Sequence, residues 1–182
     1  MSLLKSFPPL LGPAPRALIL GSMPGAASLA ADRYYAHPQN RFWPLMGELV
    51  GAEPALDYAE RCRRLLDAGV AVWDVLACCE REGSLDSAIR DDTAQPNDFV
   101  ALFALHPTIG AVMFNGSKAE SSFRRFVLPA LVQSGTDISR LHLLRLPSTS
   151  PANASQSARH KLAAWRDALE AAGIRTLPAT ST

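Results

Sequence analysis

Four short apolar runs, separated by segments with helical periodicity, constrain the fold of this chain more than any other feature. Each run has the length and composition of one buried strand, and the four lie at residues 16–21, 70–76, 108–114 and 141–146. The intervening segments place apolar side chains at helical spacing, which predicts helices at residues 42–50, 56–68, 98–105, 118–132 and 154–172. Strands that alternate with helices imply βαβ crossovers. We therefore expect an α/β fold, a three-layer α/β/α sandwich with a central, mainly parallel four-stranded sheet.

Two further segments complete this prediction. Residues 77–95 are polar and contain several turn-forming residues, so we expect a loop with a short helix there. Residues 174–177 form a candidate short fifth strand. No internal repeat or linker is visible in the 182 residues, which are 48% hydrophobic. This length suits one well-packed core, so we expect a single domain over residues 1–182.

The composition also bounds the cellular setting. No apolar run approaches the roughly 18 residues of a membrane span, and the start of the chain lacks a secretion signal, so we expect a cytoplasmic protein. We also expect a monomer. The three cysteines, Cys62, Cys78 and Cys79, lack the C-x-x-C spacing of metal sites. Buried reduced thiols are the favoured interpretation, and no metal is expected.

Polar residues follow each predicted strand. They lie in the glycine- and proline-containing loop 21–25, at Asp74, at Asn115 and in the loop 147–153. Because ligands of parallel sheets bind outside the carboxyl ends of the strands, these four places should share one crevice. Residues 34–40, with two tyrosines and several amide or imidazole groups, add an aromatic face and hydrogen-bonding groups suited to a planar heterocycle. The alternative is an ordinary loop beside half-buried tyrosine packing.

The charge is unevenly distributed, although the net value is only +1. Residues 48–100 carry five Arg against twelve Asp and Glu, and the segments on either side are positive. Arginine, which suits bidentate phosphate contacts, supplies most of the cations. One face could therefore bind a polyanion, and scattered surface arginines are the alternative explanation.

Three segments resemble motifs of the uracil-DNA glycosylase superfamily. Gly21-Ser22-Met23-Pro24-Gly25 is similar to the first motif, G-x-x-P-G or G-x-D-P-Y after a strand. Residues 36–43, AHPQNRFW, closely resemble a segment of the mismatch-specific uracil/thymine branch. Residues 146–150, LPSTS, resemble the second motif, usually H-P-S or N-P-S. The motifs occur in the family's order along nearly the whole chain, and G-S-M-P-G is most like the hypoxanthine-DNA glycosylase branch.

Two departures from the family pattern concern the chemistry. Met23 occupies the position of a catalytic Asp or Asn, and a thioether cannot orient a water or accept a proton. In the hypoxanthine branch the Asn of the N-R-F-W segment takes that role, which the resemblance assigns here to Asn40 as the catalytic residue. Leu146 replaces the His or Asn that stabilises the departing base in other branches.

The resemblance also implies base-binding residues. Backbone N–H groups of Ser22 and Met23 would face a base carbonyl, Tyr35 would stack on the base, and Asp74 would read its edge. Asn115 is a candidate from its position alone. The alternative role of Asp74 is a helix cap or a buried salt bridge, and that of Asn115 is to form a turn before Gly116. Tyr34 and His37 are interpreted as structural residues. The DNA-binding loop would comprise Ser148, Thr149, Ser150, Pro151, Ala152 and Asn153.

The sequence thus predicts a monofunctional DNA glycosylase without cofactor or metal, acting on DNA that contains deaminated bases. Hypoxanthine in deoxyinosine is the expected target, with uracil or xanthine as further substrates, in base excision repair. The target base must leave the helix stack before such chemistry. A catalytically silent nucleic-acid-binding module of the same fold is one alternative, because of Met23. A Ser-dependent hydrolase is the other, although G-S-M-P-G is not the G-x-S-x-G pattern.

Overall fold

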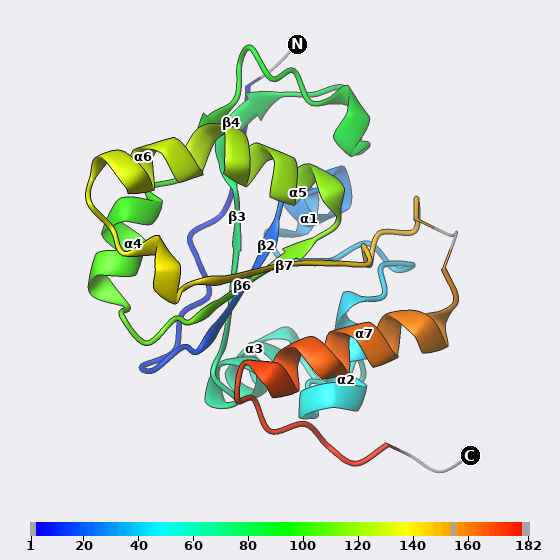
Figure 1. Cartoon of the computed structure of the whole chain (residues 1–182). Helices are drawn as coiled ribbons and strands as arrows, with labels where there is room; N and C mark the ends of the chain where they lie inside the picture. Colours follow the sequence, from blue (N-terminus) through cyan, green and yellow to red (C-terminus); the bar gives the residue numbers. More distant parts are fainter. Residues whose placement is uncertain (1–2, 154–155, 180–182) are drawn as a thin grey trace.

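A four-stranded parallel sheet forms the centre of the molecule in the computed structural model, which describes residues 3–153 and 156–179 (Figure 1). The strands are β2 (Ala17–Gly21), β3 (Val70–Asp74), β6 (Ala111–Asn115) and β7 (His142–Leu146), in the order β3-β2-β6-β7. All neighbouring pairs are parallel and in register, with Gly21 opposite Asp74 and Asn115 opposite Leu146. The predicted strand positions and the parallel sheet are confirmed.

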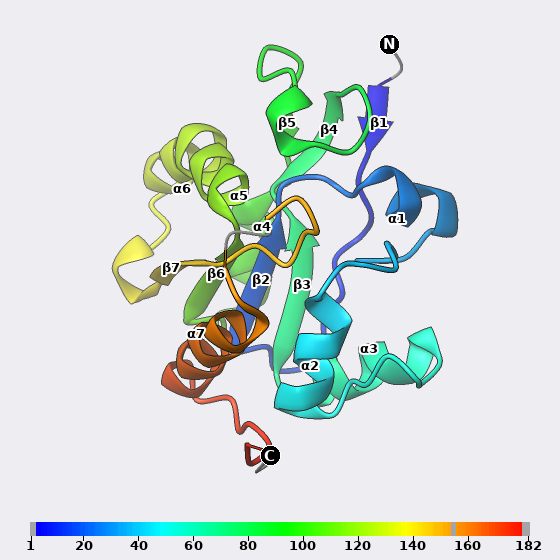
Figure 2. The same cartoon turned by 90° about the vertical axis from the view of Figure 1, so that its right-hand side faces the viewer.

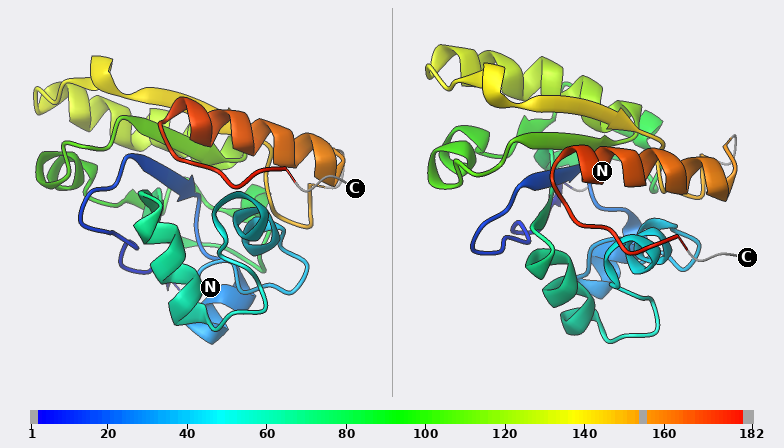
Figure 3. Two further views of the ribbon diagram at one scale, coloured as in Figure 1. Left: turned by 90° about the horizontal axis from the view of Figure 1, so that it is seen from below. Right: turned by 60° about the horizontal axis from the view of Figure 1, so that its bottom comes forward.

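Helices cover both faces of this sheet (Figures 1 and 3). One face carries α2 (Phe42–Val50), α3 (Tyr58–Asp67) and α7 (Ala158–Ala171), and the other carries α4 (Phe99–Leu105), α5 (Ser117–Ser122) and α6 (Leu128–Gln133). The alternation along β2 explains this arrangement, since Ala17 and Ile19 pack into the first core while Leu18 and Leu20 pack into the second. The three-layer α/β/α sandwich is therefore confirmed.

The predicted helix at residues 118–132 is divided into three parts. Between α5 and α6 lies a wider π-helical turn, Phe123–Val127. Pro129 stands in the first turn of α6. Proline lacks an N–H and collides with the preceding turn of a regular helix, so the local widening accommodates it.

A second, small antiparallel sheet occupies part of the region expected to be a loop. Its strands are β4 (Leu76–Glu80), β1 (Leu3–Lys5) and β5 (Gln95–Pro96), in the order β1-β4-β5. The prediction of a loop over residues 77–95 was therefore wrong at its start, because β4 follows β3 after one residue. Cys78 and Cys79 lie in β4 as buried free thiols, as expected, and so does Cys62 in α3. The remaining short helices are α1 (Ala26–Ala31), which was not expected, and two 3-10 turns, Asp86–Ala88 and Ile138–Arg140.

The end of the chain also differs from the prediction. Residues 174–177 form no strand. Instead, Ile174 is buried in the first core and the Leu177 N–H donates to the Leu49 carbonyl, so this segment packs beside α2. The predicted start of the last helix, at residues 154–155, lies outside the described residues. Helix α7 begins at Ala158, after the Ser157 side chain accepts a hydrogen bond from the His160 N–H.

The carboxyl ends of the four parallel strands lie on one edge of the sheet, which Figure 2 shows from the front. Loop 147–153 crosses this edge beside the segment that leads into α2, and the Arg41 N–H donates to the Thr149 carbonyl at 2.9 Å. Gly116, with φ of +99°, lets the end of β6 approach the loop, since a Cβ there would lie 3.0 Å from the Ser148 Cβ. The four loops therefore converge as the sequence indicated.

Candidate active site

A buried carboxyl group, Asp74, lies at the centre of this edge. Its side chain is 4% exposed, and its Oδ2 has no hydrogen-bond partner among the described residues. Burial, followed by the nearby charge of Asp86, raises the pKa of Asp74 to about 8, and the charge of Arg81 opposes this shift. A pKa raised this far favours the protonated form of Asp74 near neutral pH, and a protonated carboxyl group can donate a hydrogen bond. We expected an ionised carboxylate, or else a cap or salt bridge, and the described residues show no ion pair or capping bond of Asp74.

Gly21 is required by the close approach of Asp74. A Cβ at Gly21 would lie 2.6 Å from Oδ1 of Asp74 and 3.5 Å from the hydroxyl oxygen of Tyr35. The first distance is shorter than any ordinary contact, so a side chain at this position would displace the carboxyl group. The glycine that opens the first motif thus leaves the space in which Asp74 and the Tyr35 hydroxyl approach the end of β2.

Tyr35 has an unusual environment for a tyrosine. Its backbone φ is +54°, and its hydroxyl is buried without a hydrogen-bond partner among the described residues, although Asn115 lies close by. Burial, followed by the charge of Asp74, raises the pKa of this hydroxyl. The ring stacks on Phe42 with centroids 3.9 Å apart. A base could therefore stack only on the opposite ring face. Tyr34 is packed, as expected, with its hydroxyl donating to the Pro8 carbonyl at 2.9 Å.

Asn115 fastens loop 147–153 to the end of β6. Its Nδ2 donates to the Thr149 Oγ1 at 2.9 Å, and its Oδ1 accepts from the Thr149 N–H at 2.8 Å. Thr149 is completely buried. Both groups of the Asn115 carboxamide are thus engaged with the loop, and Thr149 faces the interior. Contact of either side chain with a base or DNA stays a prediction.

Helix α7 holds the same loop from its other side. The Lys161 ammonium donates to the carbonyls of Ser148 (2.8 Å) and Asn153 (2.6 Å), and Trp165 Nε1 donates to the Pro147 carbonyl (3.0 Å). Lys161 is only 5% exposed, and burial, followed by the charge of Arg41, lowers its pKa. A cavity of about 240 Å³ separates the loop from Arg41 and α7.

Asn40 lies where the chain enters α2. Its half-buried side chain accepts a hydrogen bond through Oδ1 from the Phe42 N–H at 2.9 Å, and its own N–H donates to the His37 carbonyl. The Phe42 ring is the one that stacks on Tyr35. Asn40 is therefore fixed at the start of α2, the helix whose Phe42 ring stacks on Tyr35. His37 accepts from the Gln39 N–H through Nδ1, which agrees with its structural interpretation.

The loop of the first motif is covered by a segment that sequence reasoning missed, residues 81–88. The Arg81 guanidinium donates to the carbonyls of Met23 (3.4 Å) and Pro24 (2.5 Å), and Ser84 Oγ accepts from the Ala26 N–H (2.9 Å). Met23 is 5% exposed and packs in the second core, so its side chain offers nothing to a ligand.

Ser22 Oγ, in the same loop, donates to Asp86 Oδ1 at 2.5 Å. Its hydroxyl is thus paired with a carboxylate and not with a histidine, the base of a serine hydrolase triad. The polar residues between 81 and 87 were the available signal for this segment, but their target could not be read from the sequence.

Comparison with known proteins identifies the family of this chain. The family model of the uracil DNA glycosylase superfamily matches residues 8–169. The chain belongs to this superfamily. Over 116 residues it is 36% identical to proteins named hypoxanthine DNA glycosylase from Methanosarcina barkeri and from Methanosarcina acetivorans, a match that covers 63% of this chain and 72% of each relative. The chain is a DNA glycosylase.

A solved structure shows the same fold. A solution NMR structure from Methanosarcina acetivorans, of a protein assigned as a uracil DNA glycosylase, superimposes with a TM-score of 0.75 and 31% sequence identity. The match covers 94% of this chain and 99% of that chain. The resemblance in the three motifs is thereby confirmed. No helix within residues 3–153 and 156–179 has the length and apolar character needed to cross a bilayer.

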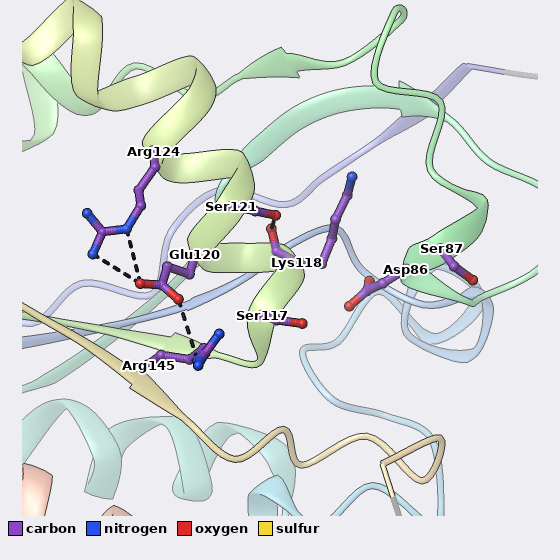
Figure 4. Close-up of a pocket in the computed structure, with 8 residues that line it drawn as sticks. All are labelled: Asp86, Ser87, Ser117, Lys118, Glu120, Ser121, Arg124 and Arg145. Carbon is purple, nitrogen blue, oxygen red and sulfur yellow. Dashed lines mark hydrogen bonds and ion pairs between the residues drawn. The ribbon is translucent and has the colours of Figure 1, made fainter.

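An open cavity of about 610 Å³ adjoins the active site of this glycosylase (Figure 4). Its lining comprises Asp86, Ser87, Ser117, Lys118, Glu120, Ser121, Arg124 and Arg145. Glu120 pairs with Arg124 and Arg145, and Lys118 pairs with Asp91. The cations of this cavity are already engaged in ion pairs. The buried polar groups without a partner among the described residues, Asp74 Oδ2 and the Tyr35 hydroxyl, make their surroundings the candidate base site, and Asp86 lies between the cavity and the first-motif loop.

Proposed function

We propose that this glycosylase removes hypoxanthine from deoxyinosine in DNA by hydrolysing the N-glycosidic bond, as a step of base excision repair. Uracil and xanthine are further candidate substrates. The observation that carries the proposal is the pair of buried polar groups without partners, Asp74 Oδ2 and the Tyr35 hydroxyl, at the end of β2 and β3. Native proteins rarely leave buried polar groups unpaired, so a ligand with hydrogen-bonding groups is expected to complete them.

The chemistry of Asp74 suits a deaminated base. Hypoxanthine, uracil and xanthine each present an N–H next to a carbonyl oxygen. A neutral carboxyl group accepts from the N–H and donates to the carbonyl, which gives two matched hydrogen bonds. Because burial raises the pKa of Asp74 to about 8, the group holds the required proton at pH 7. An ionised carboxylate would repel the carbonyl oxygen.

Asn40 is proposed to orient the attacking water. Its Oδ1 accepts one hydrogen bond from the Phe42 N–H and has a second lone pair for the water. The water attacks C1′ of a sugar that has oxocarbenium character as the base departs. Backbone N–H groups of Ser22 and Met23 are proposed to stabilise the negative charge that grows on the base, where one such donor is typically worth ~3 kcal/mol.

Loop 147–153 is proposed to contact the DNA around the extruded nucleotide. Its exposed tip consists of Pro151 and Ala152, and its base is fixed by Asn115 and Lys161. A rigid loop loses little conformational entropy when it binds, which favours insertion beside a base step.

The test is a cleavage assay on duplexes that each contain a single deoxyinosine, uracil or xanthine, with alkali to break the abasic sites. We expect product from the deoxyinosine duplex, and loss of that product in Asn40→Ala. Gln39→Ala is the matched control, since Gln39 is exposed and its side chain makes no hydrogen bond within the described residues. Binding of every duplex without product would instead support the silent nucleic-acid-binding module.

A further inference from the structure

Three side chains of the proposed site, those of Asn40, Met23 and Asp74, supply no negative charge. Asn40 is a neutral carboxamide, Met23 is an apolar thioether, and Asp74 keeps its proton at pH 7 because burial raises its pKa to about 8. Breaking an N-glycosidic bond leaves positive charge on the sugar, and the attacking water must lose a proton. Neither Asn40 nor Met23 can accept a proton. A carboxylate from elsewhere in the chain would both stabilise the cationic sugar and accept the proton.

Asp86 is placed to supply that charge. It lies in the 81–88 segment, whose two ends are joined by the bridge between Arg81 and Ile89. The segment is fastened to the first-motif loop at three places: by Arg81 at the Met23 and Pro24 carbonyls, by Ser84 at the Ala26 N–H, and by Asp86 itself at Ser22 Oγ, 2.5 Å away. The position of Asp86 is therefore set by the same loop that the base must face.

The carboxylate of Asp86 contacts the first-motif loop at Ser22 Oγ and is also open to solvent. It is exposed and lines the 610 Å³ cavity, where Figure 4 shows it pointing away from the chain of the 81–88 segment. Its charge acts on the buried groups, since it contributes to the raised pKa of both Asp74 and Tyr35. Asp86 is thus close to the base site from the side that water can reach.

We propose that Asp86 is a second catalytic residue, the carboxylate that stabilises the cationic sugar and takes a proton from the attacking water. This inference rests on the proposed glycosylase function. The water oxygen forms a bond to C1′, the C1′–N bond breaks, and its electron pair leaves with the base. One water proton passes to Asp86 and then to solvent, and the departing base takes up a proton from solvent. The products are the free base and an abasic sugar.

The first test compares Asp86→Asn with Glu82→Gln by single-turnover cleavage of a deoxyinosine duplex. Both variants remove one negative charge from the 81–88 segment, but Glu82 is exposed and does not line the cavity. We expect Asp86→Asn to lower the single-turnover rate by about 10²-fold, a typical effect of losing one preorganised electrostatic group. Its dissociation constant for DNA should stay within about threefold, because the change acts on the transition state. Glu82→Gln should keep the wild-type rate.

The second test asks whether the carboxylate itself is responsible. In Asp86→Ala, added formate should restore part of the rate, and added acetamide should not. A merely structural role of Asp86 would predict no response to formate. The proposal is overturned if Asp86→Asn cleaves as fast as Glu82→Gln. It is also overturned if Asp86→Asn loses both its activity and its cooperative unfolding transition while formate fails to rescue Asp86→Ala. If the wild-type protein releases no base from any duplex, the proposed function fails, whereas full activity in Asp86→Asn refutes only this inference.

Discussion

The neutral state of Asp74 makes a quantitative prediction about stability. The pKa of Asp74 is raised from 3.8 to about 8 in the folded protein, so between these values the folded state holds a proton that the unfolded state releases. The stability contributed by this proton is fully present below pH 3.8 and is lost as the pH rises toward 8. Each pH unit in this window costs ~1.4 kcal/mol, so Asp74 should lower the free energy of unfolding by about 4 kcal/mol at pH 7.

Asp74→Asn removes the titration while keeping the shape of the side chain. The effect of the substitution on packing does not depend on pH, so the informative quantity is how the stability difference between variant and wild type changes between two pH values. From pH 5 to pH 7 the variant should gain about 3 kcal/mol relative to wild type. Urea unfolding at both pH values measures this, and the gain corresponds to a relative shift of the midpoint of about 1 M or more.

The control is Asp167→Asn, because Asp167 lies exposed on α7 and its carboxyl stays in water in the folded state. Its stability difference from wild type should be nearly constant between pH 5 and pH 7. If the Asp74→Asn difference were equally constant, within about 0.5 kcal/mol, Asp74 would be ionised in the folded protein. The proposed pairing with the N–H and carbonyl of a deaminated base would then have to be abandoned.

Three further predictions concern the residues that position the site. Gly21→Ala places a Cβ 2.6 Å from the buried carboxyl group of Asp74, so it should lower the free energy of unfolding by about 1–3 kcal/mol and abolish base release. In the control Gly110→Ala, no atom lies within 4 Å of the added Cβ, so urea unfolding and cleavage should be unchanged. Thr149→Val leaves the Asn115 Nδ2 group without its partner and should lower the free energy of unfolding by about 1–3 kcal/mol; an unchanged urea midpoint would contradict the loop attachment. Lys161→Met removes two hydrogen bonds to the carbonyls of loop 147–153, so titration with a deoxyinosine duplex should show weaker binding. Lys161→Arg should recover part of the affinity. Equal affinities of Lys161→Met and wild type would show that DNA binding does not depend on these two hydrogen bonds.

The parallel sheet could be predicted because its information is local. The strands β2, β3 and β6 are buried along their whole length and are apolar up to their last residue, and β7 adds Leu143, Leu144 and Leu146. The small antiparallel sheet could not be predicted, because β4 pairs with residues 3–5 and with a two-residue strand at residues 95–96. Such distant pairings leave no periodic signal, and the polar residues after Glu80 favoured a loop. The candidate strand at residues 174–177 was a short apolar segment that packs on α2 instead.

The site was predictable in its location but not in its electrostatics. Loops at the ends of parallel strands must converge, so the places of Gly21, Asp74 and Asn115 followed from the strand pattern. The charge of a carboxyl group depends on its burial, which Tyr35 and the first-motif loop create only in the folded chain. Asp86 was missed for a related reason, since its hydrogen bond spans 64 residues to Ser22 within a segment that resembles no motif.

The protonation of Asp74 depends in part on the charge of Asp86. Asp86 is exposed and hydrogen-bonded by Ser22, and its negative charge is one reason why Asp74, fully buried, keeps its proton. In the proposed mechanism, two nearby carboxyl groups in unlike surroundings divide the work of a hydrolase, one as a hydrogen-bond donor to the base and the other as an anion toward the sugar and water. The buried Asp74 Oδ2 and Tyr35 hydroxyl, which have no partner among the described residues, both reduce stability, and the wholly apolar strand β2 beneath them offsets that cost. In this proposal, a chain with Met23 in the first motif takes its negative charge from the 81–88 segment, which carries the Asp86 carboxylate to the same loop.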